Sequence, residues 1–318
     1  MATYILRRLF MAVIIILIVT VIVFLAMRLL PGDPILMLLT QSDLKQLTAE
    51  QLQILRHEYG LDRSLFYQYG DWFSGVVKGD LGVSIRYNTS VTSEVLRRLP
   101  ITLHLGLLAF AFGFVFGIPA GVMCAVRRGS KLDAIITALT NIGITVPVFW
   151  LGILMMYVFS LYLRWLPTYG YTSPFTDFWL NTKQIIMPVI CLALFPVAST
   201  ARQTRSSMLE VMRQDYIRTA WSKGLIERIV IMKHAMKNGL IPIVTLSGLG
   251  LGGILGGSVL IESVFAIPGM GRLVIASVQN HDYAVTQGVT LVIATGIILV
   301  NLVVDISYGW LDPRIRIG

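Results

Sequence analysis

Charged residues are scarce in this chain. Asp, Glu, Lys and Arg make up 14% of its 318 residues, whereas hydrophobic residues make up 55%. A soluble globular domain carries nearer a quarter of charged residues, so this balance excludes an ordinary soluble protein. We expect instead an all-α integral membrane protein.

Motifs of enzyme chemistry are missing as well. The sequence holds no HExxH, GxSxG or CxxC pattern, and its four histidines are scattered without metal-ligand spacing. A GxxxxGK[ST] phosphate loop is also absent, so any ATP that drives this protein binds to another polypeptide. Cysteine is rare: Cys124 and Cys191 both fall in apolar runs and are expected as small core residues rather than a disulfide or metal pair. We therefore expect no catalytic residue, metal or cofactor in this chain.

Six apolar runs are long enough to cross a membrane, because about 20 helical residues span its hydrocarbon core. They are residues 9–27, 101–126, 134–163, 185–201, 239–261 and 283–304. The first is too long for a signal peptide, and LPGDP (30–34) follows it in place of a cleavage site. The third holds Gly143 and Pro147, which predict a bend or an outward-projecting helix.

Basic residues cluster at alternate ends of these runs. Fifteen Lys and Arg lie near the two termini and in the loops at 127–131 and 202–237, against three in the other short loops. Positive charge marks the cytoplasmic side, so both termini should be cytoplasmic and residues 31–100 outside. The net charge of +9 is thereby explained by topology, and nucleic-acid binding is set aside.

The outer segment 31–100 shows two local patterns. Residues 48–51 (TAEQ) form a capping box, and Gly60 is placed to end the helix that the box begins. Five aromatic residues then crowd into positions 66–73. They predict an interfacial anchor, with a docking surface for an external partner as the alternative.

Ionisable groups within the runs are few: Arg28, His104, Glu262 and Asp305, each near a helix end. Snorkelling or an interfacial hydrogen bond explains each better than a proton relay does. Six glycines occur between residues 247 and 258, among them Gly248, Gly252, Gly253, Gly256 and Gly257. Their spacing favours close helix packing, and the alternative is the wall of a translocation pathway.

The loop 202–238 is the most informative segment. It carries eight basic and three acidic residues, and Tyr216, Ala220 and Lys223 share one face of a predicted helix. Lys223 suits a helix C-terminus and Gly224 supplies the stop. An ordinary basic cytosolic loop is one interpretation. The other is a rigid helical knob that fits a groove on a soluble partner.

Residues 218–224 (RTAWSKG) resemble the EAA loop of type I ABC importer permeases, in the version of the peptide/nickel group. Matching segments run along the chain: LPGDP (30–34), GDLGVS (79–84), TRSSMLEV (204–211), KHAMKN (233–238), VFAIPGMGRL (264–273), DYAVTQG (282–288) and DPRIR (312–316). Arg218 and Thr219 replace the first two residues of the general EAA pattern, and the later Ile-x-Leu-Pro is matched only loosely, at 240–242. Both departures are usual in the peptide branch. Trp221, where a smaller or charged residue is common, is a further departure.

The resemblance implies a multi-pass permease of the cytoplasmic (inner) membrane, most like the first permease of dipeptide and oligopeptide importers. It implies a first helix plus an extracytoplasmic scaffold at 1–100, a five-helix core at 101–308 and a cytoplasmic tail at 309–318. Expected partners are a second homologous permease, two ATPase subunits that hold ATP and Mg²⁺, and an external solute-binding protein. The implied coupling residues are Asp215, Tyr216, Arg218, Thr219, Ala220, Lys223 and Gly224. A cargo of nickel chelates, glutathione or oligosaccharide, and a receptor or scaffold without transport, remain as alternatives.

Overall fold

The computed structural model describes residues 2–29, 49–58, 62–84 and 88–311. Within these ranges the regular structure is helical, apart from one isolated antiparallel bridge between Val83 and Ser90. The LPGDP and DPRIR segments, Thr48 and Gly60 lie outside the described residues. The all-α class is therefore confirmed.

Among the described residues, four helices are long and apolar enough to cross a membrane: α1 (Ala2–Leu29), α6 (Val91–Val126), α9 (Phe178–Val211) and α15 (Tyr283–Leu311). They cover four of the six predicted runs. Helix α9 is longer than predicted, since it stays helical through Pro188 and Pro196 and takes in the first ten residues of the loop 202–238. Helix α13 (Ile241–Val264) covers the fifth run, although several of its side chains lie outside the described residues.

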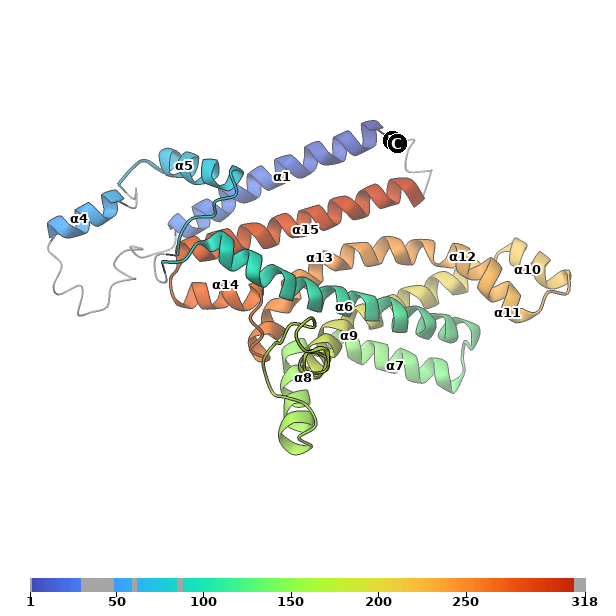
Figure 1. The fold of residues 1–318 in the computed structure, drawn as a ribbon. Helices are drawn as coiled ribbons and strands as arrows, with labels where there is room; N and C mark the ends of the chain where they lie inside the picture. Colours follow the sequence, from blue (N-terminus) through green and yellow to red (C-terminus); the bar gives the residue numbers. More distant parts are fainter. Residues whose placement is uncertain (1, 30–48, 59–61, 85–87, 312–318) are drawn as a thin grey trace.

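The third predicted run is broken, as Gly143 and Pro147 suggested. Helices α7 (Lys131–Thr145) and α8 (Val148–Met155), the latter continued by a π-helical turn at Met156–Tyr162, meet at a bend of 104°. Proline disfavours helical geometry at the residue before it, and Val146 and Pro147 are both extended. Helix α8 therefore points away from the bundle (Figure 1). Counting this pair as one span gives five candidate spans among the described residues.

The centre of the bundle is the pair α6 and α9. Gly113, Gly117 and Gly121 form a stripe on α6 at four-residue spacing, and α9 packs directly onto it. A Cβ at Gly117 would lie 2.8 Å from the Cβ of Thr200, and one at Gly121 would lie 2.5 Å from the backbone oxygen of Ala201. Such a small-residue stripe lets two membrane helices approach closely, so α6 and α9 form the closely packed central pair of the bundle.

Two ends of the bundle can be distinguished in Figure 1. Helix α10 (Asp215–Ser222) marks one end, here called the inner end, and α5 (Leu65–Val77) and α14 (Met270–Gln279) lie toward the other, the outer end. Helix α4 (Ala49–Glu58) agrees with the predicted capping-box helix and also lies at the outer end. A hydrogen bond from His57 at 2.6 Å holds the pKa of the Asp62 carboxyl below its usual value and ties α4 to the following turn.

Helices α1 and α15 run side by side at one edge of the bundle. At their inner ends the Tyr4 hydroxyl donates to the backbone oxygen of Asp305 at 3.0 Å, and Arg8 forms an ion pair of 2.8 Å with the Asp305 carboxylate. At the outer end of α1, Phe24 packs against the rings of Tyr69 and Trp72 on α5. Two residues of the predicted interfacial anchor, Tyr69 and Trp72, thus pack against α1.

The structure locates the ionisable side chains that the sequence predicted near helix ends. It also locates the two cysteines. Asp305 pairs with Arg8, Arg28 lies 5.4 Å from the centre of the Phe24 ring, and His104 shares a 3.0 Å hydrogen bond with the Tyr171 hydroxyl. Glu262 is fully buried rather than interfacial. Cys124 and Cys191 are buried and free, which confirms their role as core residues.

Candidate functional site

The segment between α9 and α13 folds into a compact inner end. Helix α10 is followed by α11 (Glu227–Ile229), a π-helical stretch at Val230–Ala235 and α12 (Met236–Gly239). In Figure 1 these elements lie together beyond the inner end of α9. For the loop 202–238 the sequence allowed either an ordinary basic loop or a helical knob. The structure shows the helical knob, meaning residues 215–239.

Apolar contacts fasten α10 to this knob. Ile217 is fully buried and Ala220 is 6% exposed, and both belong to one apolar cluster with Met208 of α9 and with Val230 and Ala235. The predicted face of Tyr216, Ala220 and Lys223 is only partly correct, because Ala220 is buried whereas Tyr216 and Lys223 are exposed. The residues that fasten α10 to the knob are Ile217 and Ala220, which share one face of the helix at i, i+3 spacing. Sequence reasoning missed Ile217, although it is the only branched aliphatic residue in the helix.

The opposite face of α10 is polar and open. Asp215, Arg218, Thr219 and Trp221 are exposed, and the Asp215 and Arg218 side chains form a long contact of 3.4 Å. Tyr216 accepts a 2.9 Å hydrogen bond from the Asn238 side chain, which ties α10 to α12. This exposed surface combines aromatic rings with side chains of both signs of charge.

The end of α10 follows the prediction. Lys223 is its C-cap, and its backbone N–H donates to the Thr219 oxygen at 3.1 Å. Gly224 has φ +73° and its N–H donates to the Trp221 oxygen at 2.9 Å. This left-handed conformation suits glycine and is strained for a β-branched residue. Gly224 therefore sets where the helix stops.

The knob is joined to the axis of the bundle through α9. The Ser207 hydroxyl donates to the Gly239 backbone oxygen at 2.7 Å, and a Cβ at Gly239 would lie 2.7 Å from the Met208 sulfur. Met208 and Ile217 also belong to one apolar cluster, together with Val230 and Ala235. The knob is therefore packed as one body onto the inner end of α9.

The glycine run of α13 divides into two groups. Gly252 faces α15, where an added Cβ would lie 3.1 Å from Ile297, so this position serves close helix packing. At Gly253 and Gly256 an added Cβ would meet no described atom within 4 Å. The surroundings of Gly248 and Gly257 lie outside the described residues. A pathway wall at these glycines stays a prediction.

The outer end is fastened by buried polar bonds. Glu262 of α13 accepts a 2.7 Å hydrogen bond from the Thr102 hydroxyl of α6 and a 3.1 Å bond from the backbone N–H of Arg272 at the start of α14. Thr102 in turn accepts from the Met270 N–H at 2.8 Å. A carboxylate at a helix N-terminus satisfies free N–H groups and complements the helix dipole. Three helices thus meet at one carboxylate.

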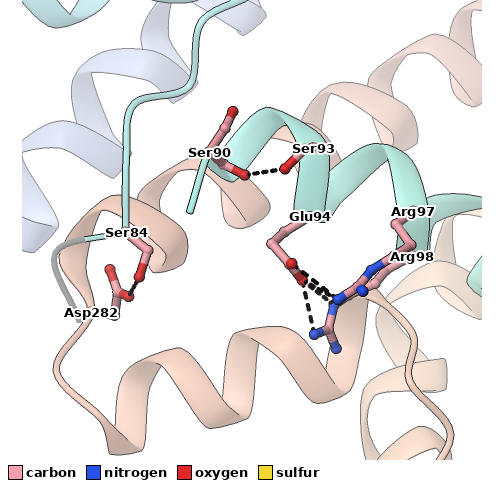
Figure 2. Close-up of polar contacts among 7 residues, drawn as sticks. All are labelled: Ser84, Ser90, Ser93, Glu94, Arg97, Arg98 and Asp282. Carbon is pink, nitrogen blue, oxygen red and sulfur yellow. Dashed lines mark hydrogen bonds and ion pairs between the residues drawn. The ribbon is translucent and has the colours of Figure 1, made fainter. Parts of the chain in front are cut away.

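A second polar tie connects two segments that the sequence singled out separately (Figure 2). Ser84, the last residue of GDLGVS, donates to the buried carboxylate of Asp282, the first residue of DYAVTQG, at 2.5 Å. Nearby, Glu94 of α6 binds Arg97 and Arg98 at 2.9 and 3.0 Å. A cavity of about 220 Å³ lies among Ser84, Glu94, Arg98 and Asp282. Pairing of the two segments was not foreseen, because they are 198 residues apart.

The amino-acid sequence matches two family models. Residues 117–317 match the binding-protein-dependent transport system inner membrane component, and residues 1–106 match the N-terminal part of that membrane component. A peptide transport system permease protein of Brucella abortus (strain 2308) is 41% identical over 319 residues, covering 99% of both chains. The dipeptide transport system permease protein DppB of Escherichia coli (strain K12) is 38% identical over 339 residues, again covering 99% of both.

The fold also matches a solved structure. An inward-facing MetNI methionine ABC transporter superposes with a TM-score of 0.57 at 20% identity, covering 69% of this chain and 96% of that chain. This likeness supports the helical architecture of the core. With both family models and the full-length relatives, it leads to one conclusion: the chain belongs to the family of inner membrane components of binding-protein-dependent transport systems, as a multi-pass transport subunit.

Proposed function

We propose that this chain is a permease subunit of an ATP-driven importer of dipeptides or short oligopeptides, and that α10 is its coupling helix. The cargo follows from the full-length relatives, which are named as peptide and dipeptide permeases. The geometry of α10 carries the coupling role: a short helix with a buried apolar anchor and an open polar face, at the inner end of the bundle.

The proposed partners are a second homologous permease, two ATPase subunits with ATP and Mg²⁺, and an external solute-binding protein. Asp215, Tyr216, Arg218, Thr219 and Lys223 present the surface that seats in an ATPase groove. ATP-driven closure of the ATPase pair draws α10 with it, and the apolar cluster that includes Ile217 and Met208 passes that movement to α9. The permease pair then alternates between inward-open and outward-open states, which is a two-state equilibrium biased by ligand binding.

The proposed topology has six spans with both termini on the side of α10. Three observations support it. The inner ends of α1 and α15 are joined through Asp305, and the same end of the bundle carries α10. Basic residues also concentrate in the segments at this end. In this arrangement Gly253 and Gly256 on α13 are available to line the pathway.

Gly224 offers a sharp test of the coupling role. Gly224→Val should abolish ATP-driven uptake of dialanine into vesicles, because a β-branched residue is strained at φ +73° and the end of α10 must shift. Gly224→Asn is the matched control, since asparagine tolerates the left-handed conformation, and it should keep most of the uptake. Equal uptake by the two variants, at equal membrane levels, contradicts the assignment of α10.

The composition of the complex tests the function itself. A tagged copy extracted from its own membranes in mild detergent should have the native mass of two homologous permeases with two ATPase chains. A homo-oligomer without an ATPase contradicts the importer and restores the receptor or scaffold as the better explanation.

A further inference from the structure

A polar groove of about 620 Å³ opens between the inner parts of α6, α7 and α9. Four arginines line it, Arg128, Arg202, Arg205 and Arg213, against the single carboxylate of Glu210. Its volume lies within the range of about 300–1,000 Å³ that is usual for small-molecule sites. Neither the sequence patterns nor the family resemblance pointed to this groove.

The groove extends well into the bundle. Helices α7 and α9 run antiparallel, since Asp133 pairs with Arg205 near the inner end and Gly143 faces Ala198 further in. Along α9, which ends at Val211, the lining runs from Glu210 back to Ala201, about 14 Å of helix, and it continues into the turn at Arg213 and Gln214. It therefore reaches far beyond the surface that surrounds α10.

The α7 wall of the groove is polar at depth. Thr137, Thr140 and Asn141 face it, and Ser206 lies across from them on α9. Exposed apolar side chains, such as Ile135 and Leu139, occupy other positions of α7. Polar side chains inside a membrane segment characteristically line a water-filled cavity, and lipid tails favour the apolar positions. The groove thus presents polar side chains on its α7 wall as well as arginines, beside the apolar Cys124, Ile136 and Leu209.

The four arginines are not equivalent. Arg205 is neutralised by a two-point ion pair with Asp133, with nitrogen–oxygen distances of 2.8 and 2.9 Å. Asp133 also accepts from the Gly129 N–H at 3.0 Å, which holds the pair in place. In the described part of the chain, Arg128, Arg202 and Arg213 have neither an ion pair nor a side-chain hydrogen bond. These three guanidinium groups are free to bind an anion.

We infer that this groove is the inner mouth of the translocation pathway, and that Arg202, assisted by Arg128 and Arg213, binds the carboxylate of the departing peptide. The inference rests on the proposed peptide importer and adds a cargo site on the permease itself. A guanidinium matches a carboxylate in a two-point, charge-assisted hydrogen bond. Arg202 lies about 14 Å of helix from Val211, where α9 ends, and α10 begins only after the following turn, so Arg202 is set apart from a surface docked on α10.

The test uses the nucleotide-free complex of both permeases and both ATPases in phosphatidylcholine nanodiscs, without the binding protein. Labelled dialanine should bind saturably, and dialaninamide, which lacks the carboxylate, should compete about ten-fold or more weakly. Arg202→Gln should weaken dialanine binding by a similar factor, whereas Arg202→Lys should retain part of it. Arg127→Gln is the matched control, because Arg127 is exposed next to the groove but does not line it.

Equal competition by dialanine and dialaninamide overturns the carboxylate site, and this comparison needs only the parental protein. Full binding by Arg202→Gln overturns the role of that residue. Loss of dialanine binding in nanodiscs that contain phosphatidylglycerol assigns the groove to lipid phosphate and also overturns the inference. If ATP-driven uptake of dialanine with the binding protein persists without binding in the groove, only this inference fails. If the intact system takes up no dialanine at all, the proposed function fails.

Discussion

The outer end of the bundle and helix α10 at the inner end are fastened in different ways. At the outer end, directional polar bonds join α6, α13 and α14 through Glu262 and Thr102, and join residue 84 to α15 through Asp282. At the inner end, α10 is seated by the apolar side chains of Ile217 and Ala220. Among the described residues, its one side-chain hydrogen bond to another helix comes from Asn238.

This difference suits two mechanical tasks. Hydrogen bonds have preferred distances and angles, so several at one carboxylate hold three helices in one arrangement. Apolar burial is non-directional and tolerates small shifts without losing its free energy. The bonds at Glu262 thus favour one fixed geometry at the outer end, whereas the apolar seat of α10 suits the coupling movement proposed above.

The largest expected effect is at Glu262. Glu262→Ala removes a buried acceptor and leaves the Thr102 hydroxyl and an α14 N–H unsatisfied, which should destabilise the folded protein by about 3 kcal/mol. Thermal unfolding of the purified permease in detergent measures this loss. Ser263→Ala is the control, since the Ser263 hydroxyl bonds only within α13, to Val259. An unfolding temperature equal to that of the control contradicts the role of Glu262.

Ile217→Ala should have the next largest effect, and it should be functional rather than global. Removing a fully buried branched side chain costs about 2–4 kcal/mol, and here the loss falls on the seat of α10. We expect normal membrane insertion but a large drop in peptide taken up per ATP hydrolysed. Ile226→Ala, at a position 63% exposed, should leave that ratio unchanged. A similar ratio in both variants excludes Ile217 as the anchor.

Ser84→Ala tests the second outer tie. It removes one donor to the buried Asp282 carboxylate and should cost about 1–2 kcal/mol. Amide hydrogen exchange at residues 81–84 and at the start of α15 should accelerate together, because the two segments lose their direct bond. Ser93→Ala, whose hydroxyl bonds only to the neighbouring Ser90 backbone, should accelerate neither. Independent exchange of the two segments in the parental protein argues against the tie.

Tyr216→Phe should have the smallest effect. It deletes the exposed bond to Asn238 and should change stability by no more than about 0.5 kcal/mol. Uptake of dialanine should stay near the parental level, because the aromatic ring of the exposed face is kept. A loss comparable with that of Ile217→Ala means that the inner end depends on polar bonds after all, and the contrast between the two ends disappears.

Several features were predictable because their causes are local. The break after Thr145 follows from Pro147, the end of α10 follows from Gly224, and the burial of Cys124 and Cys191 follows from their apolar surroundings. The Gly113, Gly117 and Gly121 stripe was equally visible as a four-residue spacing. From the sequence, close helix packing was predicted only for the glycines at 248–257, so the close packing of α6 on α9 was not predicted.

Contacts between distant segments were not predictable from one sequence. Ser84 and Asp282 stand in two recognised segments, but their pairing depends on how α15 packs against the outer segment. The groove at Arg202 depends on the register of α7 against α9, which no local pattern sets.

By itself, the sequence determined the membrane class, the positions of the apolar runs and the resemblance of the chain to importer permeases. Composition, hydrophobic run length and short motifs act over a few turns of helix and need no partner to be recognised. Only the tertiary structure decided that Ile217 seats α10, that Glu262 joins three helices, and that three arginines without an ion pair to any described residue line one groove. Each of these depends on side chains brought together by packing, and burial and pairing are properties of that packing rather than of any one segment.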